Sequence, residues 1–299
     1  MSRDGEKVSV KFGGRINGRV IAAHGRQYMV ELANGTILPC FPRGKKSEIA
    51  CGDCVDIKRT SDDQGVIEAI LPRSSLLYRS NEIRQKLIAA NVDQVVIVVA
   101  TEPAFSDELL SRALLAIESE EIEALIVLNK SDLHDKLTAA RERLALFARL
   151  GYPVLEISAR QGADALRPAL EGHTSVLVGQ SGMGKSTLIN ALIPEAQAAT
   201  REISTALDSG KHTTTHATLY HLNADSQLID SPGLQEFGLG HLDRQEIEMA
   251  FREFRPFLGH CRFRDCRHHH EPDCALNAAL ADGKIDARRF DIYRRIVGI

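Results

Sequence analysis

The sequence predicts an α/β protein with a doubly wound parallel sheet in the middle, an all-β barrel before it and a helical region after it. Three observations carry this prediction. Between residues 91 and 240, near-continuous apolar runs alternate with helical segments, which is typical of parallel strands buried on both faces. Residues 7–71 contain five short strand segments separated by turn signals. Residues 241–299 are helix-rich on either side of a cysteine and histidine cluster.

The five strands of the barrel are expected at residues 18–25, 26–32, 36–41, 54–60 and 64–72. Asn34-Gly35 is a strong hairpin signal between the second and third strands. Five short strands favour an oligonucleotide-binding (OB) barrel, whose basic loops would suit RNA. A barrel with a purely structural role is the alternative. We assign this domain to residues 1–75 and expect residues 73–86 to form a connector of mixed charge.

The α/β domain is assigned to residues 76–240. Buried strands are expected at residues 93–100, 123–129, 152–158 and 173–179, and a last single strand at 218–230. Ser106 is expected to cap a helix over residues 107–119, because a serine hydroxyl can accept from a free N–H of the first turn. A second helix is expected over residues 136–150, where apolar residues recur at helical spacing. Residues 241–299 form the third domain.

The composition excludes several classes of protein. Of 299 residues, 43% are hydrophobic and 26% charged, which rules out a mostly disordered or fibrous chain. The sequence has no apolar run of the length that a membrane span needs and no apolar signal core near its start. We therefore expect a cytoplasmic monomer that does not bind membranes, with its six cysteines as thiols or metal ligands rather than disulfides.

Charge is unevenly distributed along the chain. The formal charge is +3 for residues 1–75, −7 for residues 76–240 and +1 for residues 241–299. Local basic clusters lie near both ends. They could contact a phosphate backbone, although solvated surface is the simpler reading. The clusters comprise Arg43, Lys45 and Lys46 near the front, and Arg262, Arg264 and Arg267 near the back.

The strongest functional signal is residues 179–186, which match the phosphate-binding pattern G-x-x-x-x-G-K-[ST] between a strand and a helix. Small residues let backbone amides turn toward phosphates at the positive end of a helix. Lys185 would reach the β and γ oxygens, and Ser186 would bind Mg²⁺. The expected nucleotide contacts come from Gly179, Gln180, Ser181, Gly182, Met183, Gly184, Lys185, Ser186 and Thr187.

A second motif indicates the base. Asn129, Lys130 and Asp132 form N-K-x-D directly after a strand, and this pattern reads guanine in many GTP-binding proteins. The Asp132 carboxylate can accept from guanine N1–H and the exocyclic amine together, whereas adenine would leave it unpaired. Asn129 would tie the pocket together and the Lys130 stem would pack on the base. Ser158 and Ala159, just past the next strand, would place backbone amides at guanine O6.

Two further segments complete the set. Asp230-Ser231-Pro232-Gly233 follows an apolar run, so Asp230 would serve the outer shell of Mg²⁺ and Gly233 would offer an amide to the γ-phosphate. Between it and the phosphate loop lies G-K-H-T-T-T. Thr214 is the favoured hydroxyl to close over Mg²⁺, with Thr213 or Thr215 as alternatives, which would make residues 200–216 a switch. The alternative interpretation of this segment is a polar surface loop.

The order of these motifs is unusual. Ordinary GTP-binding domains run from the phosphate loop through the switches to N-K-x-D and S-A, whereas here N-K-x-D and S-A come first. The domain is therefore expected to be circularly permuted. Permutation would keep the site intact in space while moving the chain ends, so that D-x-x-G leads directly into the C-terminal region.

Three thiols and one imidazole lie within fourteen residues near the end of the chain: Cys261, Cys266, His268 and Cys274. Such a set is typical of a closed structural Zn²⁺ site. His269 and His270 compete for the ligand role, and spacing does not separate them from His268. Cys51-x-x-Cys54 has no second pair or histidine nearby, so we expect structural thiols there.

Together the motifs resemble the RsgA family, the circularly permuted GTPases of bacteria that depend on the small ribosomal subunit. The residues that carry the resemblance are N-K-S-D, S-A, G-Q-S-G-M-G-K-S, G-K-H-T-T-T, D-S-P-G and C-x4-C-x-H-x5-C. The resemblance implies a GTPase that binds the maturing small subunit and its rRNA through the barrel and zinc domain, and that leaves after hydrolysis. It also implies that His268 is the ligand histidine.

The attacking water has no obvious partner in the motifs. Ras-like proteins carry a water-orienting glutamine after D-x-x-G, but this chain carries the apolar Leu234. His212 is the nearest polar candidate, so His212 and Thr214 are the expected catalytic residues, and hydrolysis by the free protein should be slow. Two other interpretations stay open: a GTPase that acts on another RNA–protein partner, and a metabolic ATP-using kinase, which N-K-S-D opposes.

Overall fold

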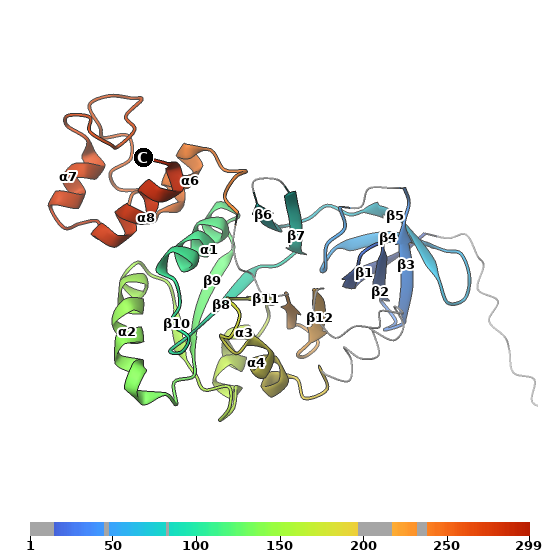
Figure 1. The fold of residues 1–299 in the computed structure, drawn as a ribbon. Helices are drawn as coiled ribbons and strands as arrows, with labels where there is room; N and C mark the ends of the chain where they lie inside the picture. Colours follow the sequence, from blue (N-terminus) through green and yellow to red (C-terminus); the bar gives the residue numbers. More distant parts are fainter. Residues whose placement is uncertain (1–14, 45–47, 82–83, 197–216, 232–237) are drawn as a thin grey trace, which may run out of the picture.

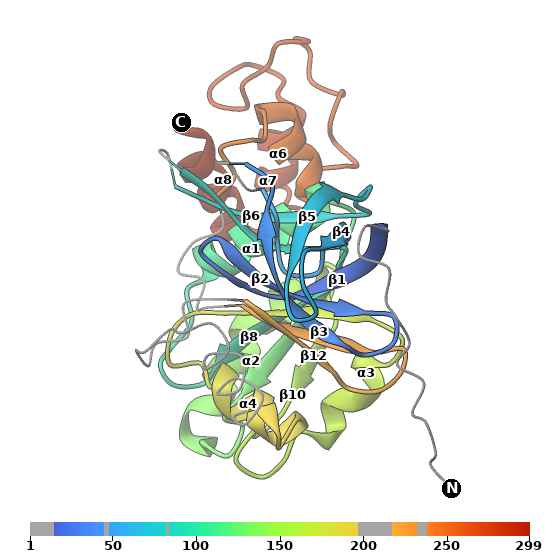
Figure 2. The same ribbon diagram turned by 90° about the vertical axis from the view of Figure 1, so that its right-hand side faces the viewer.

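The computed structural model describes residues 15–44, 48–81, 84–196, 217–231 and 238–299. Along the chain these residues form a barrel, a hairpin, an α/β sheet and a helical region (Figure 1). Figure 2 looks onto the barrel, with the C-terminal helices at the top. Among the described residues, none of the helices has both the length and the apolar character that a membrane crossing needs.

The first five strands close into the barrel that the sequence predicts. β1 pairs with β2, β2 with β3, β3 with β5, β5 with β4, and β4 again with β1. The inward side chains of Val20, Val30, Val55 and Ile57 are fully buried, as the alternation along each strand requires. The strands are β1 Arg15–His24, β2 Gln27–Leu32, β3 Ile37–Pro42, β4 Cys54–Arg59 and β5 Gly65–Ile70.

The prediction of a connector over residues 73–86 is wrong. β6 (Leu76–Asn81) and β7 (Arg84–Ala90) form an antiparallel hairpin. Its base is apolar, and Leu77, Ile88 and Ala89 are buried in the large core. Charged residues near the tip hide this strand pattern in the sequence, whereas burial of the base stabilises the pairing.

The central sheet has the predicted α/β form. Five parallel strands lie in the order β10-β9-β8-β11-β13, and every residue of β8 is buried. In Figure 1, α1 and α2 lie on one face of the sheet and α3 and α4 on the other. The strands are β8 Gln94–Ala100, β9 Glu123–Asn129, β10 Val154–Glu156, β11 Thr174–Val178 and β13 Gln227–Asp230. The helices are α1 Asp107–Ser119, α2 His134–Arg149, the 3₁₀ turn η1 Asp164–Leu166, α3 Arg167–Leu170 and α4 Lys185–Leu192.

Local signals set where the first helix begins. Ser106 caps α1, and its Oγ accepts a hydrogen bond from the backbone N–H of Leu109 at 3.2 Å. The predicted helix over residues 107–119 is therefore confirmed at both ends. Its buried face, which includes Leu110, Leu114 and Ile117, packs into the main core.

The prediction of one strand over residues 218–230 is also wrong. β12 (Thr218–His221) and β13 are antiparallel, with Thr218 opposite Asp230. The chain reverses at Asn223, whose Oδ1 accepts from the backbone N–H of Asp225 at 2.9 Å and of Ser226 at 2.7 Å. An asparagine that bonds its own backbone two and three residues on favours a turn over an extended strand.

The barrel and the α/β sheet are joined at an edge strand. β12 pairs with β13 on one side and with β1 on the other, where Ala22 lies opposite Thr218. A polar contact between His221 Nε2 and Glu31 Oε2, 2.7 Å apart, crosses the same joint. The barrel thereby covers an edge that would otherwise expose unpaired backbone groups.

The C-terminal helices are α6 Arg244–Ala250, α7 Ala275–Ala281 and α8 Ala287–Val297. Of these, α6 and α8 pack against α1. The rings of Phe251, Phe254, Phe290 and Tyr293 form a buried cluster with centroids 4.6 to 5.8 Å apart. Glu118, at the end of α1, accepts from both Arg252 and Arg255 at 2.7 Å. Apolar burial and this ion pair cluster hold the region against the sheet domain.

Candidate functional site

A cavity of about 460 Å³ lies where the carboxyl ends of β9, β10, β11 and β13 meet. Ligands bind at this edge of open α/β sheets because loops from several strands converge there. Most of the predicted nucleotide residues line the cavity, although they come from distant parts of the sequence. The lining consists of Asn129, Lys130, Asp132, Ser158, Ala159, Arg160, Ser181, Gly182, Gly184, Lys185, Ser186, Thr187, Asp230 and Ser231.

The loop before α4 needs its glycines. Gly179 has φ +149°, and a Cβ there would lie 2.3 Å from the carbonyl oxygen of Val98. Gly184 has φ +90° at the N-cap of α4, and a Cβ would lie 2.4 Å from Asn129 Nδ2. Only glycine tolerates both the backbone angle and the close approach. The loop is thus shaped to present backbone N–H groups at the start of α4.

Lys185 and Asp230 give the cavity its charge pair. The Lys185 Nζ donates to the carbonyl oxygens of Gly179 at 2.5 Å and Gln180 at 3.0 Å. Burial lowers the pKa of Lys185. Burial also raises the pKa of Asp230 to about 6, and the positive charge of Lys185 only partly offsets this. The cavity therefore disfavours the charged forms of Lys185 and Asp230, unless other charged groups bind beside them.

Asn129 is the hub of the other half of the cavity. It is 2% exposed, its Nδ2 donates to the carbonyl of Met183 at 2.9 Å, and its Oδ1 accepts from Ala159 N–H at 3.0 Å. It also accepts from Lys130 N–H at 2.8 Å. One buried amide thus ties the loops after β9, β10 and β11 together.

The side chains of Asp132 and Lys130 line the cavity, and hydrogen bonds hold both in place. Ser158 Oγ donates to Asp132 Oδ1 at 2.6 Å, and this hydrogen bond is the main reason that the pKa of Asp132 is lowered. Lys130 Nζ donates to the carbonyl oxygens of Glu102 at 2.5 Å and Gly182 at 2.7 Å. The Asp132 carboxylate therefore stays ionised. The Lys130 side chain reaches from the loop after β9 to the loop before α4.

Three predicted residues do not line the cavity. Met183 is buried and contributes its carbonyl to Asn129, as described above. The Gln180 side chain points to α1 instead, where its Oε1 accepts from the N–H of Ser106 at 3.1 Å. Gly179 lies against Val98 at the base of the loop. These three shape the loop from outside the cavity.

Sequence reasoning missed two lining residues, Arg160 and Ser231. Arg160 is exposed, and its positive charge adds to the lowering of the Asp132 pKa. Ser231 is buried, and its Oγ donates to the carbonyl of Leu177 at 2.9 Å. Each directly follows a residue that the motifs identified, so adjacency to S-A and to Asp230 was the available signal.

Several predicted residues lie outside the part of the chain that the structure describes. They are the expected catalytic residues His212 and Thr214, the alternatives Thr213 and Thr215, and Gly233 and Leu234 of the D-x-x-G segment. Their roles stay predictions.

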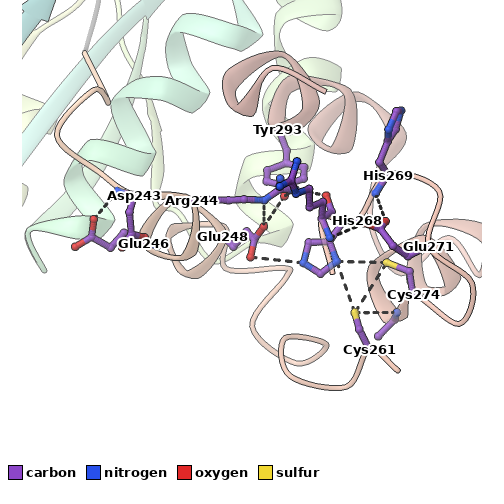
Figure 3. A network of polar contacts seen from close by, with 12 residues as sticks. Asp243, Arg244, Glu246, Glu248, Cys261, His268, His269, Glu271, Cys274 and Tyr293 are labelled. Carbon is purple, nitrogen blue, oxygen red and sulfur yellow. Dashed lines mark hydrogen bonds and ion pairs between the residues drawn. The ribbon is translucent and has the colours of Figure 1, made fainter. Parts of the chain in front are cut away.

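The second site is the cluster of cysteine and histidine residues. One ligand atom from each of Cys261, Cys266, His268 and Cys274 lies within 4.8 Å of the others, so the group could hold a metal ion. His268 Nδ1 is 3.3 Å from Cys274 Sγ and 3.6 Å from Cys261 Sγ (Figure 3). His269 and His270 are exposed and do not belong to the group. The structure thus selects His268 among the three adjacent histidines.

Cys51 and Cys54 are free cysteines of the barrel. Neither belongs to a metal-type group among the described residues. Cys51 is 1% exposed, and burial raises its pKa to about 12. A thiol so protonated and covered is inert toward metals and oxidants.

Comparisons with known proteins show the family of this chain. The RsgA GTPase family model matches residues 70–240. The chain belongs to the RsgA GTPase family. Its members named "Small ribosomal subunit biogenesis GTPase RsgA" include one from Burkholderia pseudomallei strain K96243, which is 56% identical over 97% of this chain and 94% of its own length. Another, from Nitrosospira multiformis, is 54% identical over 94% of this chain and 90% of its own length.

Two solved structures share the fold of this chain. YjeQ from Thermotoga maritima has a TM-score of 0.71 at 30% identity, over 95% of this chain and 99% of that one. YloQ, described as a circularly permuted GTPase, has a TM-score of 0.68 at 28% identity, over 95% of this chain and 94% of that one. The predicted fold class is confirmed: a circularly permuted GTPase domain with a closed five-stranded barrel before it and a Cys3His group after it.

Proposed function

We propose that this chain is a GTPase that binds the small ribosomal subunit and couples GTP hydrolysis to late subunit assembly and to its own release. The observation that carries the proposal is the single cavity in which N-K-x-D, S-A, the phosphate loop and Asp230 converge. The small ribosomal subunit is the proposed partner because the relatives are named for its biogenesis. We propose domain boundaries at 1–75, 76–240 and 241–299, where the middle unit largely coincides with the matched residues 70–240.

The nucleotide fits the cavity by chemistry at both ends. Asp132 is ionised and aimed into the space, which suits the N1–H and amine of guanine. Lys185 is desolvated and, among the described residues, donates to the loop carbonyls of Gly179 and Gln180, so its ammonium group suits the β and γ oxygens. The backbone N–H groups around Ser181 and Gly182 and the start of α4 would cradle the phosphates. GDP would use the same contacts without those to the γ-phosphate.

The cavity also contains residues that suit Mg²⁺. Ser186 and Asp230 both line the cavity, and hydroxyl and carboxylate oxygens are the donors that Mg²⁺ prefers. We assign Ser186 as its ligand, Asp230 to its water shell, and Thr214 as the ligand that joins in the GTP state. When bound there, Mg²⁺ would neutralise the negative charge that develops on the phosphate groups during hydrolysis.

Asp230 makes nucleotide binding dependent on pH. Its pKa of about 6 in the free protein lies above the ordinary 3.8, so the neutral form is favoured at low pH, whereas Mg²⁺ requires the carboxylate. We expect the affinity for Mg·GDP to fall as the pH drops below about 6 and to level off above it. Calorimetric titrations across pH, in buffers of different ionisation enthalpy, should detect proton release near pH 6.

Asp230→Asn is the control for this pH dependence, because the titration of the nucleotide itself is common to both proteins. We expect weaker binding by the variant at neutral pH but no additional step near pH 6. A variant that keeps the full step would exclude Asp230 as its source.

Zinc fits the Cys3His group. Three thiolates and one imidazole with no spare ligand position are a donor set of structural Zn²⁺ sites. His268 and Cys274 are buried and Cys261 and Cys266 are partly buried, which limits the access of solvent ligands to the site. We propose that zinc supplies local folding energy there and no chemistry.

The barrel and the metal loop are the proposed contacts with rRNA. Arg262, Arg264 and Arg267 are exposed around the metal group, and Arg43 is exposed on the barrel. Guanidinium groups pair well with phosphate. We further propose that the protein acts as a cytoplasmic monomer without a membrane partner.

The rate of GTP hydrolysis with and without purified small subunits tests the function. We expect a slow enzyme alone and stimulation on the order of 100-fold by small subunits, since placing one acid–base group correctly is worth ~10²–10⁴-fold. His212→Ala should lose most of this stimulation and still bind GTP and subunits.

His173→Ala is the matched control, because His173 pairs with Asp93 just before β11 begins. It should respond to small subunits like the unchanged protein. Equal stimulation of His212→Ala would refute the role of His212 alone. Stimulation by a different RNA–protein particle and not by small subunits would favour the alternative partner.

A further inference from the structure

The two ring nitrogens of His268 face different groups. Nδ1 faces the thiols of Cys261 and Cys274, whereas Nε2 lies 3.5 Å from Glu248 Oε2 (Figure 3). His268 is 5% exposed and Glu248 8% exposed, so water has little access to either. A neutral imidazole that gives one nitrogen to a metal keeps its proton on the other, and that buried N–H needs an acceptor.

Glu248 is held in place from two sides. Tyr293 of α8 donates its O–H to Glu248 Oε1 at 2.5 Å. Arg244, one turn earlier on α6, donates its Nε–H to the same oxygen at 2.9 Å. The second oxygen, Oε2, is thereby left for His268. These two hydrogen bonds fix the position of the carboxylate.

We propose that Glu248 is a positioning residue of the metal centre. It accepts the Nε2–H of His268 and so holds the imidazole in the tautomer and orientation that present Nδ1 to the metal. Metal-bound histidines commonly donate their second N–H to a carboxylate, which fixes the ring and makes the ligand more basic. The proposal rests on the proposed metal site, and Glu248 itself does not contact the metal.

The charges around the site agree with this role. A divalent cation with three thiolates is already net negative, so an additional buried carboxylate would be costly if it were unpaired. The guanidinium of Arg244 neutralises Glu248, with an N–O distance of 2.9 Å. Glu248 can thus remain ionised beside an anionic centre and accept a strong hydrogen bond.

The same contacts connect the metal to helices that supply no ligand from within their own span. Glu248 belongs to α6 and Tyr293 to α8, and both helices pack against α1 of the GTPase domain. Through Glu248, metal binding is therefore coupled to how these two helices are held. The alternative is that Glu248 only connects α6 to α8. In that case its removal would not change the affinity for the metal.

Zinc affinity of the full-length protein tests the proposal, measured by competition with a chromogenic chelator. Glu248→Ala should bind zinc about 10- to 100-fold more weakly, the usual effect of removing the partner of a ligand histidine. Glu248→Gln should recover part of the loss, because its amide oxygen can accept the same N–H. Glu246→Ala, which breaks the capping box of the same helix, should keep the original affinity.

Cobalt(II) in place of zinc gives a readout that a purely structural role would not move. Glu248→Ala should change the visible d–d bands, because His268 loses its fixed orientation, and Glu246→Ala should not. Unchanged zinc affinity and an unchanged cobalt spectrum in Glu248→Ala would overturn the proposal.

Two further outcomes are decisive. If Glu248→Ala does not fold, Glu248→Gln decides: weaker affinity with a shifted spectrum supports the proposal, and original values overturn it. A starting protein that binds neither metal would refute the metal site itself, whereas metal binding without any effect of Glu248 would refute only the positioning role.

Discussion

Asp132→Asn is expected to convert the protein from a GTP-binding to a xanthosine-triphosphate-binding one. The carboxylate can accept two hydrogen bonds from guanine, and a hydrogen bond to a charged group contributes ~1.5–3 kcal/mol. Losing one of them and repelling the exocyclic amine should weaken GTP by on the order of 100-fold. Xanthine carries an oxygen in place of that amine, which suits the amide N–H₂ of asparagine.

Fluorescent-nucleotide competition measures the switch. Asp135→Asn is the matched control, since Asp135 is an exposed acid in the first turn of α2, three residues further on. It should leave the preference unchanged. Unchanged GTP affinity in Asp132→Asn would sink the assignment of the base site, and equal binding of ATP by the starting protein would favour a kinase-type enzyme.

Removing the metal is expected to release the segment between Gly259 and α7 while nucleotide binding persists. No helix or strand is described between α6 and α7, and α7 has only seven residues with Cys274 as its N-cap. A helix this short is unstable without tertiary contacts. Structural zinc contributes ~10–16 kcal/mol of apparent binding energy in small zinc domains, which is also local folding energy. The cavity, formed by the sheet domain, contains no residue of this region.

Metal content, limited proteolysis and GDP affinity should be measured together for Cys261→Ala. We expect loss of zinc, rapid cleavage within the released segment and GDP affinity near the original value. Cys54→Ser removes a thiol outside the metal group and should keep full zinc content. Full zinc retention in Cys261→Ala would contradict the ligand set, and lost GDP binding would show that the two sites are coupled.

The barrel, the α/β sheet and the cap at Ser106 follow from local patterns in the sequence. Apolar alternation, continuous apolar runs and a serine before an apolar helix each depend on neighbours within one or two turns of chain, so they are readable without tertiary structure. The two errors have local causes as well. Charges near the tip hid the strands of β6 and β7, and the turn at Asn223 was read as part of a strand.

The sequence by itself determined the GTPase chemistry and the circular permutation, because the motifs N-K-x-D, S-A and the phosphate loop are short, and their order is visible along the chain. Only the tertiary structure decided which residues meet. It selected His268 over His269 and His270, added Arg160 and Ser231 to the cavity, and paired β1 with β12. The physical reason is that contacts across the fold depend on where packing brings separate elements, and nothing in the spacing of Glu248 and His268 encodes that they touch.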